Sequence, residues 1–145
     1  MIKWGQPIWM FLHTLSLKLS EQKYALLKKE VFSMIKLVCS SLPCPDCASH
    51  ATEHMKRASI PPTAAALQKF LFDFHNSVNV RTGKQMTLPS VLTIYEKVNL
   101  ERIFYICRHV ILNQPYNPRL SMNKMHTQMS LREVETWLKK QNFLR

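Results

Sequence analysis

The chain has 145 residues, 46% of them hydrophobic, which is enough for one compact domain with its own core and excludes a disordered chain. Its net charge of +11 favours a polyanionic partner, but the basic residues are scattered, so a nucleic-acid-binding bundle is only an alternative. Only two glycines occur, Gly5 and Gly83, which excludes a Gly-rich phosphate loop. We expect neither a signal peptide nor a membrane span, and the cytosol is the default location.

Helices are predicted almost throughout the chain. Pro7 suits the first turn of a helix, because apolar residues recur at helical spacing over residues 8–19. A second helix is expected after Ser20, and Pro43 ends it. The motif Cys44-Pro45-Asp46-Cys47 then begins a third helix.

The later part of the chain also predicts helices. A fourth is expected over about residues 63–83, ending on a glycine that can adopt a left-handed cap. After Pro89, apolar spacing predicts a fifth helix that continues through Ile106. Residues 113–118, with two prolines, are typical of a linker, and Ser130-Leu131-Arg132-Glu133 matches a capping box that predicts a short last helix. No strand pair is evident, so the predicted fold class is all-α.

Two of the four cysteines form a C-x-x-C motif at the start of a helix. Free backbone N–H groups and the helix dipole at that position favour a thiolate, which is the attacking species in disulfide exchange. A thioredoxin-like fold would need a buried strand before the motif, and a helix is predicted there instead. We therefore expect Cys44 and Cys47 to be catalytic, and Cys39 and Cys107 to be small buried apolar residues.

A metal site is the alternative interpretation of this motif. His50 and His54 follow one turn apart on the same helix and complete a nominal set of two cysteines and two histidines. Zinc fingers, however, separate their Cys and His pairs by about a dozen residues, so that two elements meet at the ion. We therefore expect no metal, and a non-catalytic zinc-binding helical module is the alternative function.

Two further groups of residues suit an aromatic, charged cofactor. Trp9 offers a flat surface on the first helix, and His13 lies one turn later. His75 and Asn79 share a face of the fourth helix and can form hydrogen bonds to a heteroaromatic ring. Two cations that follow could neutralise a phosphate: Arg81 and Lys84. Each group alone also suits an ordinary amphipathic or solvated helix.

The order of these motifs resembles that of the Erv/ALR family of FAD-linked sulfhydryl oxidases. The family pattern is a W-G-x-x-x-W-x-x-L-H opening, a central C-x-x-C, and H-N-x-V-N followed by G-K. This chain carries all three over about residues 4–97: Trp4-Gly5, Trp9 and Leu12-His13, then Cys44 to Cys47, then His75-Asn76, Val78-Asn79 and Gly83-Lys84. The resemblance implies a four-helix bundle around FAD with a short fifth helix, and a homodimer made through apolar faces of the first helices.

The resemblance also implies an activity and its residues. The chain would be an FAD-dependent thiol oxidase that forms disulfides in protein substrates by dithiol exchange and passes electrons to FAD and then to oxygen, giving hydrogen peroxide. Cys47 would lie next to the flavin, and Cys44 would face the substrate. The implied contacts to FAD come from Trp4, Gly5, Trp9, His13, Cys47, His50, His75, Asn76, Val78, Asn79, Arg81, Lys84 and Tyr95.

The implied partners are protein dithiols, including a thioredoxin-like or small C-x-x-C carrier, and molecular oxygen. The chain lacks the separate shuttle cysteine pair of many cellular members, and in this it looks like the virus-encoded ones. This likeness implies a cytoplasmic disulfide-forming pathway in an infected cell, with the virion as a second location and the mitochondrial intermembrane space as the alternative.

We divide the chain into an oxidase-like domain over residues 1–98 and a basic, mostly helical C-terminal extension over residues 99–145. The extension holds Trp137, Leu138 and Phe143 at a spacing that suits one helix face, and a short helix cannot bury such a stripe alone. The extension must therefore dock on the catalytic bundle, on a second subunit or on a partner. We expect it to dock within the dimer or on an acidic partner, away from the chemistry, because no motif residue lies in it.

Overall fold

The computed structural model describes residues 3–115 and 124–145, and these form helices without a strand. In chain order the elements are α1 (Gly5–Leu17), α2 (Glu21–Ser40), α3 (Pro45–Arg57), α4 (Ala64–Arg81), the 3-10 turn η1 (Pro89–Val91), α5 (Leu92–Tyr95), α6 (Leu100–Leu112) and α8 (Lys124–Lys140). The predicted all-α class is thus confirmed. None of the described helices is both long and apolar enough to cross a bilayer. Residues 116–118 of the predicted linker lie outside the described residues.

Side chains fix the starts of α2 and α4. The hydroxyls of Ser20 and Thr63 cap these helices by accepting a backbone N–H from the first turn. Glu21 also reaches across to α4, where its carboxylate accepts the N–H groups of Ala64 at 2.9 Å and Ala65 at 3.0 Å. The first turns of α2 and α4 are therefore tied together.

A glycine ends α4 as the sequence predicts. Gly83 has a φ of 75°, the left-handed region that residues with a side chain rarely occupy. Its N–H donates to the carbonyl of Val80 at 3.2 Å, and the N–H of Lys84 donates to the carbonyl of Asn79 at 2.7 Å. This pair of bonds is a Schellman motif, which reverses the chain immediately after the helix.

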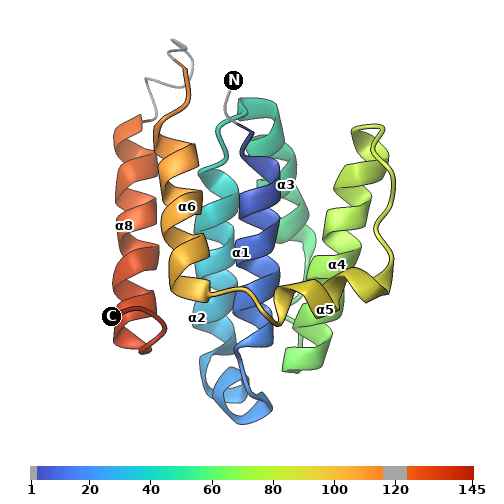
Figure 1. Cartoon of the computed structure of the whole chain (residues 1–145), viewed down its shortest axis with the longest axis vertical. Helices are drawn as coiled ribbons and strands as arrows, with labels where there is room; N and C mark the ends of the chain where they lie inside the picture. Colours follow the sequence, from blue (N-terminus) through green and yellow to red (C-terminus); the bar gives the residue numbers. More distant parts are fainter. Residues whose placement is uncertain (1–2, 116–123) are drawn as a thin grey trace.

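The helices α1 and α2 occupy the middle of the molecule, with α4 to one side and α6 and α8 to the other (Figure 1). α1 packs against α4 and α6, while α2 packs against α3 and α8. Buried apolar side chains from all of these helices form one hydrophobic cluster, which spans the predicted boundary at residue 98. Both central helices are therefore covered on two sides.

The predicted fifth helix from Pro89 through Ile106 is wrong, because the structure breaks it. η1 and α5 end at Tyr95, and α6 begins after Asn99. The side chain of Asn99 accepts the N–H of Arg102 at 2.9 Å and so caps a new helix. The apolar stripe continues across the break, which is why periodicity alone did not reveal it.

The predicted short last helix is also wrong in its start. α8 is continuous from Lys124, and Ser130 lies in its interior with 4% of its surface exposed. A serine and a glutamate three residues apart also occur inside helices, so the capping-box pattern does not by itself mark a helix start.

The C-terminal extension docks on its own chain, which corrects our expectation of a second subunit or a partner. The apolar stripe of α8 is buried in the common core: Leu131, Val134, Trp137 and Leu138. The indole N–H of Trp137 donates to the carboxylate of Glu30 on α2 at 3.1 Å. Lys23 of α2 donates to the backbone carbonyl of Gln141 at 3.0 Å and lies 4.1 Å from the ring centre of Phe143.

α6 covers α1 in the same way. The rings of Phe11 on α1 and Phe104 on α6 lie 5.4 Å apart, and both side chains are about 1% exposed. A salt bridge of 2.6 Å between Arg108 and Glu135 joins α6 to α8. The apolar faces of the first two helices, which we expected to form a homodimer, are therefore occupied by residues of the same chain.

Candidate active site

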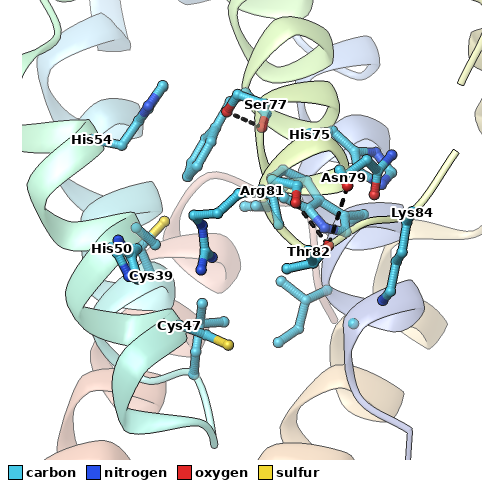
Figure 2. Close-up of a pocket in the computed structure, with 18 of the residues that line it drawn as sticks. Cys39, Cys47, His50, His54, His75, Ser77, Asn79, Arg81, Thr82 and Lys84 are labelled. Carbon is cyan, nitrogen blue, oxygen red and sulfur yellow. Dashed lines mark hydrogen bonds between the residues drawn. The ribbon is translucent and has the colours of Figure 1, made fainter. Parts of the chain in front are cut away.

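A cavity of about 1710 Å³ opens between α1, α3 and α4, and the segment after α4 and α5 closes part of it. Sites for small molecules commonly enclose about 300–1,000 Å³, so this space can hold a ligand as large as a dinucleotide. Figure 2 shows α3 and α4 facing each other across it, with labelled side chains from both.

Stacked aromatic rings form one wall of the cavity. Trp9 of α1 stacks on His75 of α4 with ring centres 4.3 Å apart and planes within 8°. Behind them, Nε2 of His13 and Nδ1 of His75 share a hydrogen bond of 3.1 Å, and the ring of His13 stacks on Tyr95 of α5 at 4.8 Å. Residues predicted from two separate motifs thus meet in one cluster, together with Tyr95.

Both histidines of this cluster are held neutral. Burial, and then the neighbouring His75, lower the pKa of His13 to about 4. Burial, and then the charge of Lys84, lower the pKa of His75 to about 4. Nδ1 of His13 is buried and has no hydrogen-bond partner among the described residues. An unpaired buried nitrogen beside a ligand-sized cavity is the pattern expected of a site that a ligand completes.

The C-x-x-C motif lies at the start of α3, as predicted. Cys44 is the N-cap residue, and its sulfur accepts the backbone N–H of Cys47 at 3.3 Å. Both are free, half-buried thiols. Cys47 lines the cavity and Cys44 does not, so the two sulfurs have different surroundings.

The expectation of a favoured thiolate does not hold for Cys47 by itself. Burial, and then the adjacent Cys44, raise the pKa of the Cys47 thiol to about 11. The positive charge of the Arg81 guanidinium acts in the opposite direction and lowers this pKa. Cys39 and Cys107 are each about 2% exposed, and burial raises the pKa of both thiols to about 12, as fits the predicted apolar role.

Basic side chains outnumber acidic ones around the cavity. Four basic residues line it, namely Lys3, Arg57, Arg81 and Lys84, against two acidic residues, Glu53 and Asp73. Both carboxylates are engaged in ion pairs along their own helices, Glu53 with Arg57 at 2.9 Å and Asp73 with Lys69 at 2.8 Å. The remaining positive charge suits a ligand that carries phosphate groups.

Most of the residues expected to contact the cofactor line this cavity. They are Trp4, Gly5, Trp9, Cys47, His50, His75, Val78, Asn79, Arg81, Lys84 and Tyr95. His13 lies behind this lining, as described above. Asn76 also lies outside it: its amide oxygen accepts the N–H of Thr87 at 2.8 Å, and its amide nitrogen donates to the carbonyl of Thr87 at 3.1 Å. Asn76 therefore fastens the segment after α4 to the helix.

The motifs did not point to several lining residues on α3 and α4. The ring of His54 stacks on Phe74 with centres 4.1 Å apart, and both line the cavity with Arg57. A helical repeat could have found them, because Cys47, His50, His54 and Arg57 are spaced by three and four residues and share one face of α3.

The alternative zinc site receives no support from the side-chain positions. Within residues 3–115 and 124–145, no three His, Cys, Asp or Glu side chains come together as metal ligands. His54 instead packs on an aromatic ring, and His50 is exposed.

A helical bundle that brings one sulfur of a C-x-x-C pair to a cavity with stacked aromatic rings and an excess of basic side chains defines a thiol-redox protein with an aromatic, charged cofactor. The Erv1/Alr family model matches residues 6–102, and the chain belongs to this family.

Curated relatives agree with this assignment. A protein of Invertebrate iridescent virus 6, named as a candidate FAD-linked sulfhydryl oxidase, is 30% identical over 96 residues, 61% of this chain and 86% of its own length. The FAD-linked sulfhydryl oxidase of African swine fever virus is 30% identical over 107 residues, 72% of this chain and 90% of its own length. No solved structure matches the chain significantly.

Proposed function

We propose that this FAD-linked thiol oxidase forms disulfide bonds in protein substrates with the pair Cys44 and Cys47. One observation carries the proposal: the Cys47 sulfur and the stacked rings of Trp9 and His75 line the same cavity. Family membership and the names of the viral relatives support the flavin-dependent activity.

The dithiol exchange uses both cysteines of the motif. A substrate thiolate attacks the Cys44 sulfur of the Cys44–Cys47 disulfide, a substrate–Cys44 bond forms, and Cys47 leaves with the electron pair. The second substrate thiolate then attacks the substrate sulfur of this mixed disulfide and releases Cys44. The substrate has lost two electrons, and the motif has gained them as a dithiol. Cys44 is partly exposed and lies outside the cavity lining, which supports its role as the sulfur that a protein substrate attacks.

The residues around the cavity fit FAD. The aromatic wall suits a flat heteroaromatic ring, the unpaired Nδ1 of His13 suits a polar group, and Lys84 supplies charge for the diphosphate. Bound FAD would supply an acceptor for the two electrons and a route for them to molecular oxygen, which would give hydrogen peroxide. The chain holds the cofactor, keeps both histidines neutral, and presents the Cys47 sulfur to the cavity.

The setting of this activity is also part of the proposal. Relatives from two viruses support a virus-encoded pathway in the cytoplasm of an infected cell, with the virion as a second location. Its substrates would be protein dithiols, among them a small C-x-x-C carrier. A homodimer remains a proposal, and because α6 and α8 cover the faces of α1 and α2, such a dimer would need another surface.

The purified full chain tests this proposal. We expect flavin absorbance, and oxygen consumption with peroxide release when a reduced protein dithiol is added. Cys44→Ser and Cys47→Ser should each abolish this turnover, while Cys107→Ala, a change within α6 and remote from the motif in sequence, should retain it. Full turnover in either motif variant, or a colourless protein after refolding with excess FAD, would refute the assignment.

A further inference from the structure

The two basic residues at the end of α4 point to different parts of the cavity. Figure 2 shows the Arg81 side chain extending from α4 towards α3, where Cys47 and His50 lie. Lys84 follows the turn at Gly83, lies on the other side of the helix end, and acts on His75. These two residues, which their spacing presents as one phosphate-binding pair, therefore serve different groups.

The environment of Cys47 makes Arg81 its source of positive charge. Burial and the neighbouring Cys44 both disfavour a charged sulfur at this position, whereas the positive charge of Arg81, whose side chain extends towards Cys47 (Figure 2), favours it. Arg81 forms no ion pair with a carboxylate of the described residues, so its charge is not neutralised there. His50, one turn along α3, is exposed and also lines this part of the cavity, and Cys39 borders it from α2.

We propose that Arg81 is a positioning residue for Cys47. Arg81 stabilises the Cys47 thiolate that is released when a substrate attacks Cys44, and it keeps the Cys47 sulfur directed into the cavity. In that step the Cys44–Cys47 bond breaks and Cys47 keeps the electron pair, so no proton is needed at the sulfur. A better-stabilised leaving thiolate departs faster, so the same contact also speeds the attack at Cys44. This inference rests on the proposed roles of the two cysteines.

The test measures the Cys47 sulfur directly in the reduced full chain. Cys44→Ser leaves Cys47 as the only thiol of the motif, and alkylation by iodoacetamide at pH 8 is followed at the Cys47 peptide by mass spectrometry. An opposite charge within about 4–6 Å commonly lowers a pKa by about 1–3. We therefore expect Arg81→Gln to slow alkylation about tenfold, and Arg81→Lys to restore part of the rate.

The matched control is Lys84→Gln, which removes the same charge from the same end of α4 but acts on His75. We expect less than a twofold change in alkylation of Cys47. Equal slowing by Lys84→Gln would mean a general effect of charge and would overturn the specific role of Arg81, as would an unchanged rate in Arg81→Gln. Thermal unfolding confirms that each variant is folded.

The readout separates this inference from the proposed function. Alkylation needs neither turnover nor oxygen, so a failed oxidase assay in the unsubstituted chain would refute the function and leave the alkylation result interpretable. The long-wavelength thiolate–flavin absorbance of the flavin-loaded Cys44→Ser protein gives a second measurement. Adding Arg81→Gln should raise the midpoint pH of this absorbance by about one unit, which corresponds to the tenfold slower alkylation.

Discussion

The two faces of α1 lie in different environments, one at the cavity and the other in the packed core. Towards the cavity, α1 presents Trp9 and His13, which make specific ring and hydrogen-bond contacts. Towards α6 it presents Phe11, whose contact is apolar packing. The first side depends on the identity of each side chain, and the second on volume and apolarity. One helix can therefore carry a motif on one face while the other face retains only a hydrophobic pattern.

The largest expected effect lies on the packed side. Leu138 of α8 is fully buried and borders a small gap between α1, α2 and α8. We expect Leu138→Ala to lower the free energy of unfolding by about 2–5 kcal/mol, measured by urea denaturation. Met129→Ala on the same helix, where the side chain is 63% exposed, should change it by less than about 0.5 kcal/mol. Unchanged stability in Leu138→Ala would contradict the docking of α8.

A fall in pH should act most strongly on the cavity side. The pKa of His13 is about 4 in the folded chain, against an ordinary value of 6.5. Between pH 4 and pH 6.5, His13 is therefore protonated in the unfolded chain and neutral in the folded one. The stability from this neutral imidazole is full above pH 6.5 and is lost as the pH falls towards 4, about 3 kcal/mol in all.

Urea denaturation at pH 7.5 and pH 4.5 measures this loss. His13→Asn should reduce the difference between the two pH values, whereas His109→Asn, at an exposed position on α6, should leave it unchanged. An equal effect of both substitutions would remove the distinction between the two sides.

The smallest expected effect concerns the turn after α4. A Cβ at Gly83 would meet no atom within 4 Å, so the cost of Gly83→Ala comes from its φ of 75° alone, about 1 kcal/mol. The turn also places Lys84, so the variant should bind FAD more weakly. Gly5→Ala, which has equal space and no such backbone strain, should change stability by less than about 0.5 kcal/mol. Equal costs at both glycines would show that the turn is not strained.

The sequence predicted the local elements of the cavity side well. Ser20, Pro43 and Gly83 mark helix ends because each has a direct effect on backbone hydrogen bonding or conformation. The prediction that Trp9 and His75 share one site came from the order of the motifs along the chain, through the family resemblance. The direction of the Arg81 side chain, towards Cys47 on α3, was not predicted, because helical spacing gives the face of a residue and not the element opposite it.

The packed side was predicted less completely. The stripe containing Trp137 and Leu138 correctly indicated that one face of α8 must be buried. The sequence did not decide whether it is buried on the catalytic bundle, on a second subunit or on a partner. The deciding contacts, such as Trp137 with Glu30, join residues more than a hundred positions apart and leave no local signal. The break at Asn99 and the start of α8 were missed for local reasons, because an apolar stripe continues across the first and a capping-box pattern lies inside the second.

The position of α8 has a consequence during synthesis of the chain. α2 ends at Ser40, but the helix that covers its apolar face ends only at Lys140. At about 5–20 residues per second, a ribosome needs roughly 5 to 20 seconds to make the intervening segment. During this time the face of α2 that α8 will cover stays exposed, and nascent chains on neighbouring ribosomes can pair through it. A chaperone that shields this face of α2 until α8 emerges would therefore raise the yield of correctly folded protein.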